Sequence, residues 1–514
     1  MTFQTLLQSL HRYGTPAGMS RIARAVLDRR IVAHSPLFDR EWYVREHPDV
    51  AQAGTDPALH YLVIGHRAGL DPSPNFCGAE YAALHHLPAD TNPLVHYERI
   101  GRRKGLPISF LATEKAVSQE EAVSRLREKM GRGEPLECLF LVASAAMFPA
   151  RPLLDAMLRD GAFRPRIAVI PDLRWPDRDP IAPMERCEAE LGEAYPGVLL
   201  PPVRPDAGGQ WPDLLSPADF AVYPSPYNLS DFHYNPRWSR GRPFLGLYVN
   251  YGYPCTAFAL SVLGLRNYAY FWKVFLETDD ALRYYRQMSP IGGVNGVVAG
   301  AVKMDALAGF PANATGRKRV LIAPHHSVEG GLNESLALSN FLRYADYFAA
   351  LPNRYPDLDF ILRPHPFLFL VLAGAGFWGE ERCRKWKDTW LAHPNALWSE
   401  GGDYMREFAA SDAIVQDCSS FLMEYVFTGK PCCYMLKSPT DISRKFLSNG
   451  QECLEYSYLA YRAEDIDAFL QDVVARGRDA KAEGRAAFAK RLMLHHPHAA
   501  DAALRLVRHS LSTT

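Results

Sequence analysis

The 514-residue chain has no excess of charge of either sign, because 57 lysines and arginines balance 57 aspartates and glutamates. Such a chain has no overall field that attracts nucleic acid or anionic lipid, so we expect no nucleic-acid partner. Apolar residues are plentiful, since 48% of the chain is hydrophobic and 22% is charged. This composition is typical of globular proteins, and the length has room for two or three domains with large cores.

Long apolar runs and paired cysteine motifs are also missing. No run approaches the ~18 residues of a membrane-spanning helix, and the best candidate, Phe367 to Phe377, is too short. The N-terminus lacks a charged segment followed by a long apolar one, so we expect no signal peptide. The nine cysteines show no metal-ligand spacing, which favours buried thiols in a reducing compartment. We therefore expect a cytoplasmic protein, at most peripheral at the inner face of the cytoplasmic membrane. The basic amphipathic pattern of residues 1–30 favours a helix that packs on a domain, and contact with a membrane surface is the alternative.

A pattern repeats between Pro36 and Pro107. Aromatic residues recur 38 positions apart, and a proline, a His-Tyr pair and a glycine recur 36 positions apart: Phe38 with Phe76, Tyr43 with Tyr81, Pro57 with Pro93, His60-Tyr61 with His96-Tyr97, and Gly65 with Gly101. Two copies of a helix, a turn and a helix predict a small helical module. The two histidines raise the alternative of a metal site, but a repeated His-Tyr on an apolar helix favours a packed pair with a satisfied imidazole.

The rest of the chain is organised around the stretch from Ser411 to Tyr434. Ala413-Ile414-Val415 indicates a buried strand of a parallel sheet, and helical spacing follows from Phe421. Between them lie polar residues, of which Ser419 or Ser420 suits the helix N-cap. Open α/β sheets bind ligands at this end of a strand, where the N–H groups of a helix attract phosphate.

Two strands upstream end in the same way. Ile361-Leu362 leads into Arg363-Pro364-His365-Pro366, and Val320 to Ala323 leads into Pro324-His325-His326-Ser327. A core strand needs no polar side chains at its carboxyl end, so three such turns predict a ligand site. Helix and strand also alternate from Leu136 onward, which predicts parallel sheets.

The turn RPHP, the block SDAIVQDCSSFLMEYVFTGKP and the turn APHHS resemble the CDP-glycerol glycerophosphotransferase family of teichoic-acid and capsule-type polymerases. The resemblance runs from about Leu136 to the C-terminus and is densest between Val320 and Lys437. It implies an α/β fold of the GT-B glycosyltransferase superfamily, in which two Rossmann-like domains face a cleft. The N-terminal repeat resembles segments of bacterial polysaccharide-biosynthesis glycosyltransferases, which supports such a pathway and assigns no chemistry.

This fold leads us to expect five segments. They are an N-terminal helix in residues 1–33, a helical two-repeat module in 34–110, a linker in 111–134, a Rossmann-like acceptor domain in 135–312 and a Rossmann-like nucleotide-donor domain in 313–514. The final helices, Asp479 to Leu492 and Ala499 to His509, are expected to pack back across the acceptor domain, as C-terminal helices do in GT-B enzymes.

The resemblance also implies where the donor binds. In GT-B enzymes the nucleotide lies on the second domain, where fixed positive groups stabilise the leaving phosphate. We expect His365 as a catalytic group there, beside a set of donor-phosphate and nucleotide contacts: Arg363, Asp417, Ser419, Ser420, Glu424, which suits the ribose hydroxyls, and Lys430. No D-x-D motif ends a strand, since Asp177-Arg178-Asp179 lies in a proline-rich loop, so we expect transfer without a metal and no cofactor.

One position departs from the family pattern. Many members carry a His-Gly pair after a first-domain strand, where the histidine looks like the base that activates the acceptor, and this chain has Tyr251-Gly252. A tyrosine with a pKa near ~10 is a poor base at neutral pH. The base is then His325 or His326, or a carboxylate such as Glu329, or the reaction differs from glycerophosphate transfer. We predict that His326 is the base and that Tyr251 lines the acceptor site.

The function implied is a transferase of bacterial cell-surface polysaccharide or teichoic-acid-like polymer synthesis. It would move glycerol phosphate or a sugar from a nucleotide-activated donor to a glycan or lipid-linked acceptor. The donor stays open between CDP-glycerol, CDP-ribitol and a nucleotide sugar. Two alternatives also remain: a capsule or O-antigen glycosyltransferase that uses a CMP-sugar or another nucleotide sugar, and an inactive GT-B scaffold or binding protein.

Overall fold

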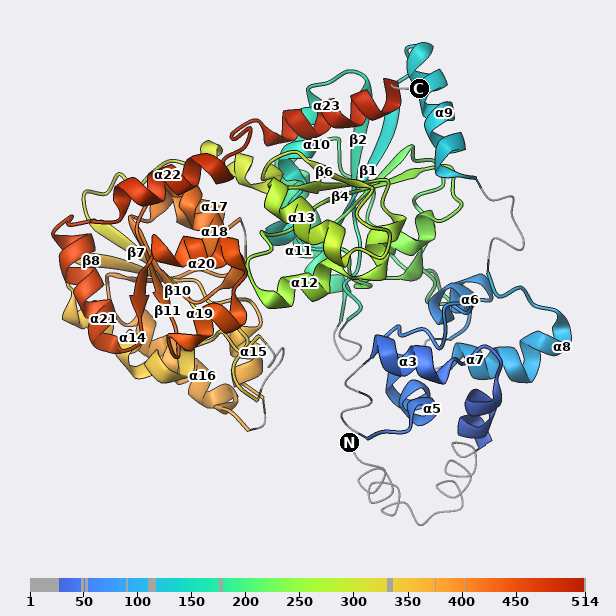
Figure 1. Cartoon of the computed structure of the whole chain (residues 1–514), viewed down its shortest axis with the longest axis horizontal. Coiled ribbons are helices and arrows are strands. Elements are labelled where there is room, and N and C mark those ends of the chain that lie inside the picture. The colour runs from blue at the N-terminus through green and yellow to red at the C-terminus, as the bar shows by residue number, and fades with distance from the viewer. Residues whose placement is uncertain are drawn as a thin grey trace.

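The computed structural model describes residues 27–47, 50, 54–88, 91–109, 117–174, 179–330, 336–374, 376–401 and 403–512. Most of the helix predicted in residues 1–33 lies outside these ranges, as do Asp177 and Arg178 of the proline-rich loop. The described chain forms two parallel six-stranded sheets, each covered by helices, and a set of short helices near its N-terminal end (Figure 1). The predicted α/β class with two Rossmann-like halves, preceded by short helices, is confirmed.

The first sheet has the strand order β2-β1-β3-β4-β5-β6, and every neighbouring pair is parallel. Its strands are β1 Leu136–Val142, β2 Phe163–Val169, β3 Phe220–Tyr223, β4 Leu245–Val249, β5 Lys273–Leu276 and β6 Gly296–Val298. The main helices of this half are α10 Arg151–Leu158, α11 Ile181–Ala194, α12 Ala257–Leu263 and α13 Asp279–Met288. The direction in which strands are added reverses between β1 and β3, which opens a crevice at their carboxyl ends.

The second sheet has the order β12-β11-β10-β7-β8-β9, again all parallel. Its strands are β7 Lys318–Ala323, β8 Leu358–Leu362, β9 Ala396–Trp398, β10 Ala413–Gln416, β11 Cys432–Met435 and β12 Tyr458–Ala460. The helices that concern the site are α14 Phe341–Arg354, α17 Met405–Ala410 and α18 Ser419–Glu424; the others are α15 Leu368–Leu372, α16 Gly379–Leu391, α19 Thr440–Lys445, α20 Ser448–Glu455 and α21 Ala463–Ala468. This is the doubly wound order of dinucleotide-binding folds, and its reversal lies between β7 and β10.

The N-terminal repeat forms two similar helical units. The first contains α3 Arg40–Glu46 and α5 Pro57–His60, and the second contains α6 Gly78–Leu84, α7 Pro93–His96 and α8 Arg102–Lys104. The repeated histidine of each unit shares a hydrogen bond with a tyrosine hydroxyl of the same unit. Tyr43 Oη lies 2.9 Å from His60 Nδ1, and Tyr81 Oη lies 3.0 Å from His96 Nδ1. The predicted satisfied imidazole is confirmed, although the phenol comes from the preceding helix and not from the adjacent tyrosine.

The repeated glycine has a steric cause. A Cβ at Gly65 would collide with the hydroxyl of Tyr43, and a Cβ at Gly101 would collide with that of Tyr81. Each unit therefore needs a glycine where its second helix passes over the phenol.

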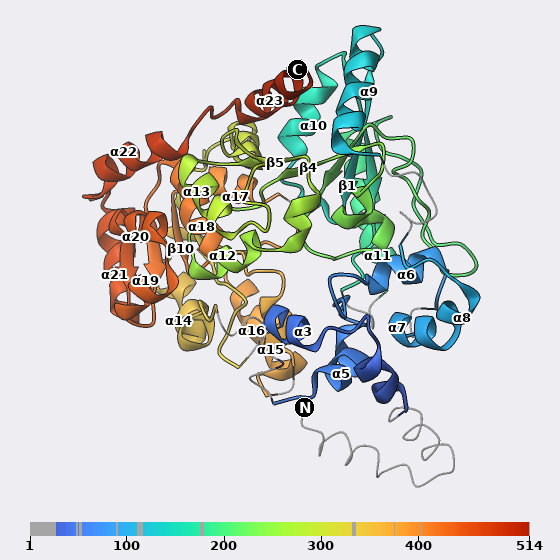
Figure 2. The same ribbon diagram turned by 45° about the vertical axis from the view of Figure 1, so that its right-hand side comes forward.

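Three further helices connect or cover the sheets. Helix α9 Gln119–Gly131 falls in the segment for which a linker is predicted, yet its Ala122 and Leu126 are buried in the core of the first sheet. Helix α22 Ala482–Leu492 packs on the second half, and α23 Ala499–Ser512 packs against α10 and α9 of the first (Figure 2). Of the two C-terminal helices expected to cross, α23 is the one that lies on the first half.

The chain thus passes between the halves twice, and the two passages touch. Gly300 has a φ of +92°, and a Cβ there would collide with the carbonyl of Leu494. The backbone N–H of Ala500 donates to Asp305 Oδ2 at 2.7 Å. The first passage therefore lies directly against the second.

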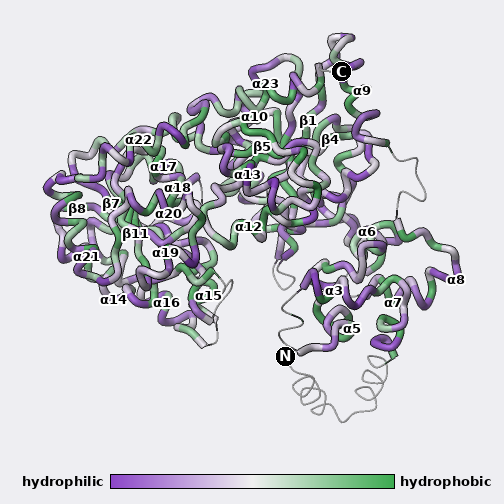
Figure 3. The backbone as a smooth tube through the Cα atoms, in the orientation of Figure 1, coloured by the Kyte–Doolittle hydropathy of each residue, from purple (hydrophilic) through white to green (hydrophobic). Residues whose placement is uncertain are grey.

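Apolar residues gather in the sheets. In Figure 3 the central strands are mostly green and the outer helices carry the purple of polar residues. All nine cysteines are free and buried, as the sequence predicts. Within the described ranges, no helix has both the length and the apolar character needed to cross a bilayer.

Candidate functional site between the two sheets

Three histidines meet at the carboxyl edge of the second sheet. His325 and His326 follow β7 and His365 follows β8, and these strands are neighbours. The ring centroids of His325 and His326 are 4.3 Å apart, those of His326 and His365 are 4.0 Å apart, and those of His325 and His365 are 5.2 Å apart. Two of the predicted polar turns therefore form one cluster of imidazoles.

Two of these imidazoles accept hydrogen bonds at Nδ1. The backbone N–H of Ser327 donates to His325 Nδ1 at 3.2 Å, and that of Phe367 donates to His365 Nδ1 at 3.2 Å. A nitrogen that accepts from an amide carries no proton, so the neutral ring holds its proton on Nε2. His365 is therefore built to donate through Nε2. At His325 the Nδ1 atom also lies 2.7 Å from Ser327 Oγ, and it accepts there when the ring carries its proton on Nε2.

Burial keeps these rings neutral. It lowers the pKa of His326 to about 4 and that of His365 to about 3, with neighbouring His326 adding to the effect on His365. Burial also lowers the pKa of His325 well below its usual range, and both neighbouring histidines add to this. At neutral pH the cluster offers hydrogen-bond donors without charge, and its rings are weak bases.

The same three residues are the candidate metal ligands of the described chain, since their ligand atoms lie within 4.8 Å of one another. A metal-bound histidine donates its second ring N–H to an acceptor. At His365 the second nitrogen instead accepts from an amide, and at His325 it lies 3.2 Å from an amide nitrogen and 2.7 Å from Ser327 Oγ. The arrangement therefore fits an anion that receives N–H groups better than it fits a metal ion.

Asp417, which follows β10, fixes the turn that carries His325 and His326. Its Oδ1 accepts the backbone N–H of His325 at 2.6 Å, and its Oδ2 accepts that of Asn340 at 2.5 Å. The carboxyl group is fully buried, and burial raises its pKa to about 7. Both oxygens therefore accept from backbone groups of the fold, and Asp417 positions the histidine turn and the start of α14. Neither oxygen is left for the nucleotide contact that the sequence predicts.

The two serines lie at the start of α18, next to the first half. The helix begins at Ser419 and its N-cap is Cys418, so the prediction of a serine cap is wrong. Among the described residues, neither serine hydroxyl has a hydrogen-bond partner, and both side chains are half-buried. A Cβ at Gly252 would lie 3.1 Å from Ser420 Cβ, so the backbone after β4 approaches α18 closely.

Arg363 is held by a loop of its own half. Its Nη1 donates to Ser399 Oγ at 2.7 Å and lies 3.3 Å from Glu407 Oε1, and its Nη2 donates to the carbonyl of Gly401 at 2.7 Å. The side chain is 11% exposed. These contacts orient the guanidinium between β9 and α17, beside the histidine turn that follows β8.

Two other predicted residues lie in different surroundings. Lys430 Nζ donates to the carbonyls of Phe408 and Ala409, at 3.1 and 2.7 Å, and so caps the end of α17. It follows the far end of the helical segment that Ser419 begins, and we assign it to this cap and not to the nucleotide. Glu329, the alternative base, is exposed and pairs with Lys437 at 2.7 Å.

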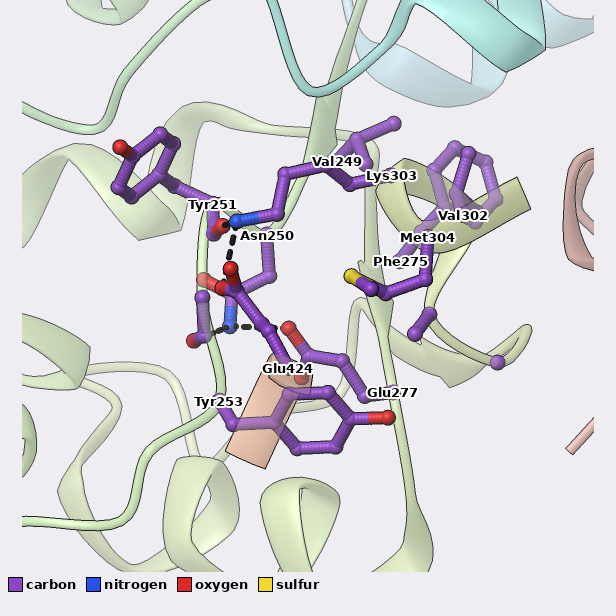
Figure 4. A pocket seen from close by; sticks show the side chains of 13 residues that line it. Val249, Asn250, Tyr251, Tyr253, Phe275, Glu277, Val302, Lys303, Met304 and Glu424 are labelled. Carbon is purple, nitrogen blue, oxygen red and sulfur yellow. Dashed lines mark hydrogen bonds and ion pairs between the residues drawn. The ribbon is translucent and has the colours of Figure 1, made fainter. Parts of the chain in front are cut away.

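Facing this edge, the first sheet contributes to a narrow pocket between the halves. Figure 4 shows it lined by the residues after β4 and β5, by Lys303, and by Glu424 of α18. Lys303 Nζ lies 2.6 Å from Glu424 Oε1 and also donates to the carbonyl of Tyr251. Tyr404 donates to Glu424 Oε2 at 2.5 Å. Glu424 is thus fully buried in an ion pair between the halves, with both oxygens used, and not open to a ribose hydroxyl.

Tyr251 forms one wall of this pocket. Lys303 Nζ lies 4.3 Å from the centre of its ring, a cation–π distance. Burial raises the pKa of Tyr251, with the nearby Glu424 adding to the rise. The phenol is therefore an even poorer base than a free tyrosine, as the sequence suggests. A second pocket continues past Tyr251 and Lys303 toward Phe148, Arg151 and Asp403.

Glu277 is the residue that sequence reasoning missed. It follows β5 and is 4% exposed, and its Oε1 accepts from Asn250 Nδ2 at 3.0 Å. Burial raises its pKa to about 7; Glu424 adds to the rise and Lys303 opposes it. The signal was present, because an acidic residue directly after the buried Val274-Phe275-Leu276 obeys the same rule as the turns of the second sheet.

Comparisons with solved structures give several matches at low sequence identity. No protein-family model and no curated protein matches it. The wall teichoic acid polymerase TagF is similar at 12% identity and a TM-score of 0.47, over 76% of this chain and 93% of that one. The S. aureus MnaA–UDP structure matches at 13% identity and 0.46, over 73% and 96%. The Neisseria meningitidis UDP-GlcNAc 2-epimerase bound to UDP-GlcNAc matches at 12% and 0.46, over 74% and 100%.

Proposed function

We propose that the chain is a transferase of bacterial cell-surface polysaccharide or teichoic-acid-like polymer synthesis. It moves glycerol phosphate or a sugar from a nucleotide-activated, CDP-linked donor to a hydroxyl of a glycan or lipid-linked acceptor. The observation that carries the proposal is that the carboxyl edges of the two sheets, which bear different polar groups, face each other and come into contact at Gly252 and Ser420. One edge offers neutral donors for a phosphate, and the other offers a buried carboxyl group for a hydroxyl.

The donor binds at the second sheet. Its diphosphate accepts the Nε2–H groups of His325 and His365 and the unpartnered hydroxyls of Ser419 and Ser420, with Arg363 as the cation alongside. The reversal of strand order between β7 and β10 is the place where such sheets bind nucleotides. Fixed donors aimed at the leaving phosphate lower the barrier because charge builds there during transfer.

The acceptor binds at the first sheet. The pocket that continues from Tyr251 and Lys303 toward Arg151 gives it a surface with both aromatic and charged groups. A hydroxyl that enters from this side reaches the carboxyl ends of β4 and β5. Transfer without a metal remains part of the proposal, since the imidazole tautomers favour an anion.

A binding protein without turnover is the second candidate. It is favoured by the Lys303–Glu424 ion pair, in which two charged groups of the pocket neutralise each other. Thermal-shift and calorimetric titrations with CDP-glycerol, a CMP-sugar and UDP- or dTDP-sugars separate the candidates. A transferase binds one of these donors and releases its nucleotide over time. A binding protein releases no nucleotide from a donor that it binds, and a scaffold responds to none of them.

Arg363 gives the first mutational test. Arg363→Ala should weaken binding of the responding nucleotide by about 2 kcal/mol, or roughly 30-fold, if the guanidinium makes a desolvated contact with phosphate. Glu407→Gln is the matched control, since it removes the carboxylate that Arg363 faces and keeps the cation. Equal losses in both variants would mean that Arg363 only holds its loop, and unchanged affinity in Arg363→Ala removes it from the site.

A further inference from the structure

Glu277 is placed as a proton acceptor at the wall of the pocket. The residue is only 4% exposed, and its Oε1 atom accepts a hydrogen bond from Asn250 Nδ2. Asn250 is itself oriented, because its Nδ2 also donates to the carbonyl of Gly252 at 2.9 Å. Figure 4 shows the carboxyl group turned toward Asn250 and Glu424, while the Tyr251 phenol points away from them.

Within the described part of the chain, the second oxygen of Glu277 has no hydrogen-bond partner. This atom, Oε2, is buried, and Glu277 is one of the residues that line the pocket. A buried polar atom without a partner costs free energy, so its persistence points to a group that completes it during function. The pocket is narrow and suits a hydroxyl group or one water better than a sugar ring.

We propose that Glu277 Oε2 takes the proton of the acceptor hydroxyl, with Asn250 as the residue that positions the carboxylate. This inference rests on the proposed function. The acceptor oxygen forms a bond to the transferred group, and the bond from this group to an oxygen of the nucleotide phosphate breaks. The electron pair of that bond stays on the phosphate oxygen, and the hydroxyl proton ends on Glu277, from which it returns to solvent.

The other candidate groups are less suited to this step. Both oxygens of Glu424 are used by Lys303 and Tyr404. Tyr251 has a raised pKa, and the pKa of His326 is lowered to about 4, whereas that of Glu277 is raised to about 7 by burial. A base works best when its pKa lies near the working pH, so Glu277 takes the role that the sequence assigned to His326.

The test uses the full chain with CDP-glycerol, a CMP-sugar and a UDP-sugar in turn, with glycerol added as the acceptor hydroxyl. Glu277→Gln keeps the shape and removes the base. We expect nucleotide release to fall about 100-fold or more while nucleotide affinity by calorimetry stays within about twofold. Asp280→Asn makes the same carboxylate-to-amide change three residues later, on an exposed side chain, and should leave both unchanged.

A pH profile gives a readout that a structural role would not move. The charged and titratable groups facing Glu277 are Lys303, Glu424 and the phenols of Tyr248, Tyr253 and Tyr268. Wild-type turnover should rise as pH increases through about 7, where Glu277 loses its proton, and the residual turnover of Glu277→Gln should lack this limb. Glu277→Asp, which keeps a carboxylate, should keep the limb at reduced turnover.

Two results with Glu277→Gln and one with the wild type would overturn the proposal. Normal turnover in Glu277→Gln overturns the proposal, and so does a loss of nucleotide affinity equal to the loss of turnover, because the residue is then structural. If wild type binds none of the three donors, the proposed function fails, and this inference falls with it. That failure is distinct, since it is seen in the titration of the wild type before any variant is made.

Discussion

The two sheets end in opposite chemistry, although both are parallel, six-stranded and ordered around one reversal. Toward the cleft the first offers a carboxyl group, an amide and an amine, and the second offers imidazoles, hydroxyls and a guanidinium. The second sheet also has a buried carboxyl group, Asp417, but its oxygens accept from the backbone of its own half. Burial raises the pKa of Glu277 and lowers that of each clustered histidine. One physical cause, the cost of a charge away from water, therefore prepares a proton acceptor on one side and neutral donors on the other.

The largest effect that we expect tests how firmly the second edge is built. Asp417→Ala leaves the backbone N–H groups of His325 and Asn340 buried without acceptors, so the free energy of unfolding should fall by about 3 kcal/mol or more. Urea denaturation measures it. Asp412→Ala, at the amino end of the same strand, is the matched control; Asp412 is half-buried, so its loss should be smaller. Equal losses would mean that the carboxyl edge is not specially dependent on its acid.

The next prediction compares how Glu277 of the first edge and His326 of the second change the stability of the protein with pH. Folded Glu277 keeps a proton up to about 7, whereas an unfolded glutamate loses it near 4.5, so this group makes stability fall as pH rises between these values. Folded His326 stays neutral down to about 4 while the unfolded ring takes a proton below 6.5, so it makes stability fall as pH drops through that window. Glu277 changes the free energy of unfolding by up to about 3 kcal/mol across its window.

The two variants should therefore diverge. Relative to wild type, Glu277→Gln should lose stability when the pH is lowered from 7.5 to 5, and His326→Gln should gain it. Denaturation curves at both pH values measure the differences. Parallel behaviour of the two variants would contradict the opposite pKa shifts on which the comparison stands.

The smallest effect concerns the N-terminal module, which lies outside both edges. It is tied to the first half by Arg237, 2.5 Å from Asp71, and by Arg266, which lies 4.7 Å from the ring of Trp42. We expect a chain that begins at Val117 to fold and to bind nucleotide within about twofold of the full chain, as calorimetry can measure. Aggregation, or loss of binding, would make the module part of the catalytic fold; Arg266→Gln in the full chain then tests the contact itself.

Much of the second edge was predictable because its pattern is local. A buried strand followed at once by His325-His326 or by Arg363-Pro-His365 marks the carboxyl end of a parallel strand, and neighbouring strands bring such ends together. The repeat was predictable for the same reason, since Tyr43 and His60 recur as Tyr81 and His96 within one short module.

The partners of charged groups were not predictable. Glu424 pairs with Lys303, 121 positions away, and no local pattern indicates that the two will meet between the halves. Asp417 and Lys430 stand in a stretch typical of phosphate sites, but their partners are backbone groups supplied by the turn after β7 and by the end of α17. Whether a polar side chain serves a ligand or the fold is decided by which distant elements pack against it.

The paired passages between the halves have a mechanical consequence. Two connecting segments in contact with each other form a hinge. They permit rotation of the halves about the line of contact and restrict sliding or twisting across it. Gly300 lies at this line, and a side chain there would meet the backbone of the returning segment. We therefore expect any hinge motion between the halves to leave this line nearly still and to separate the halves most at the ends of the cleft farthest from it.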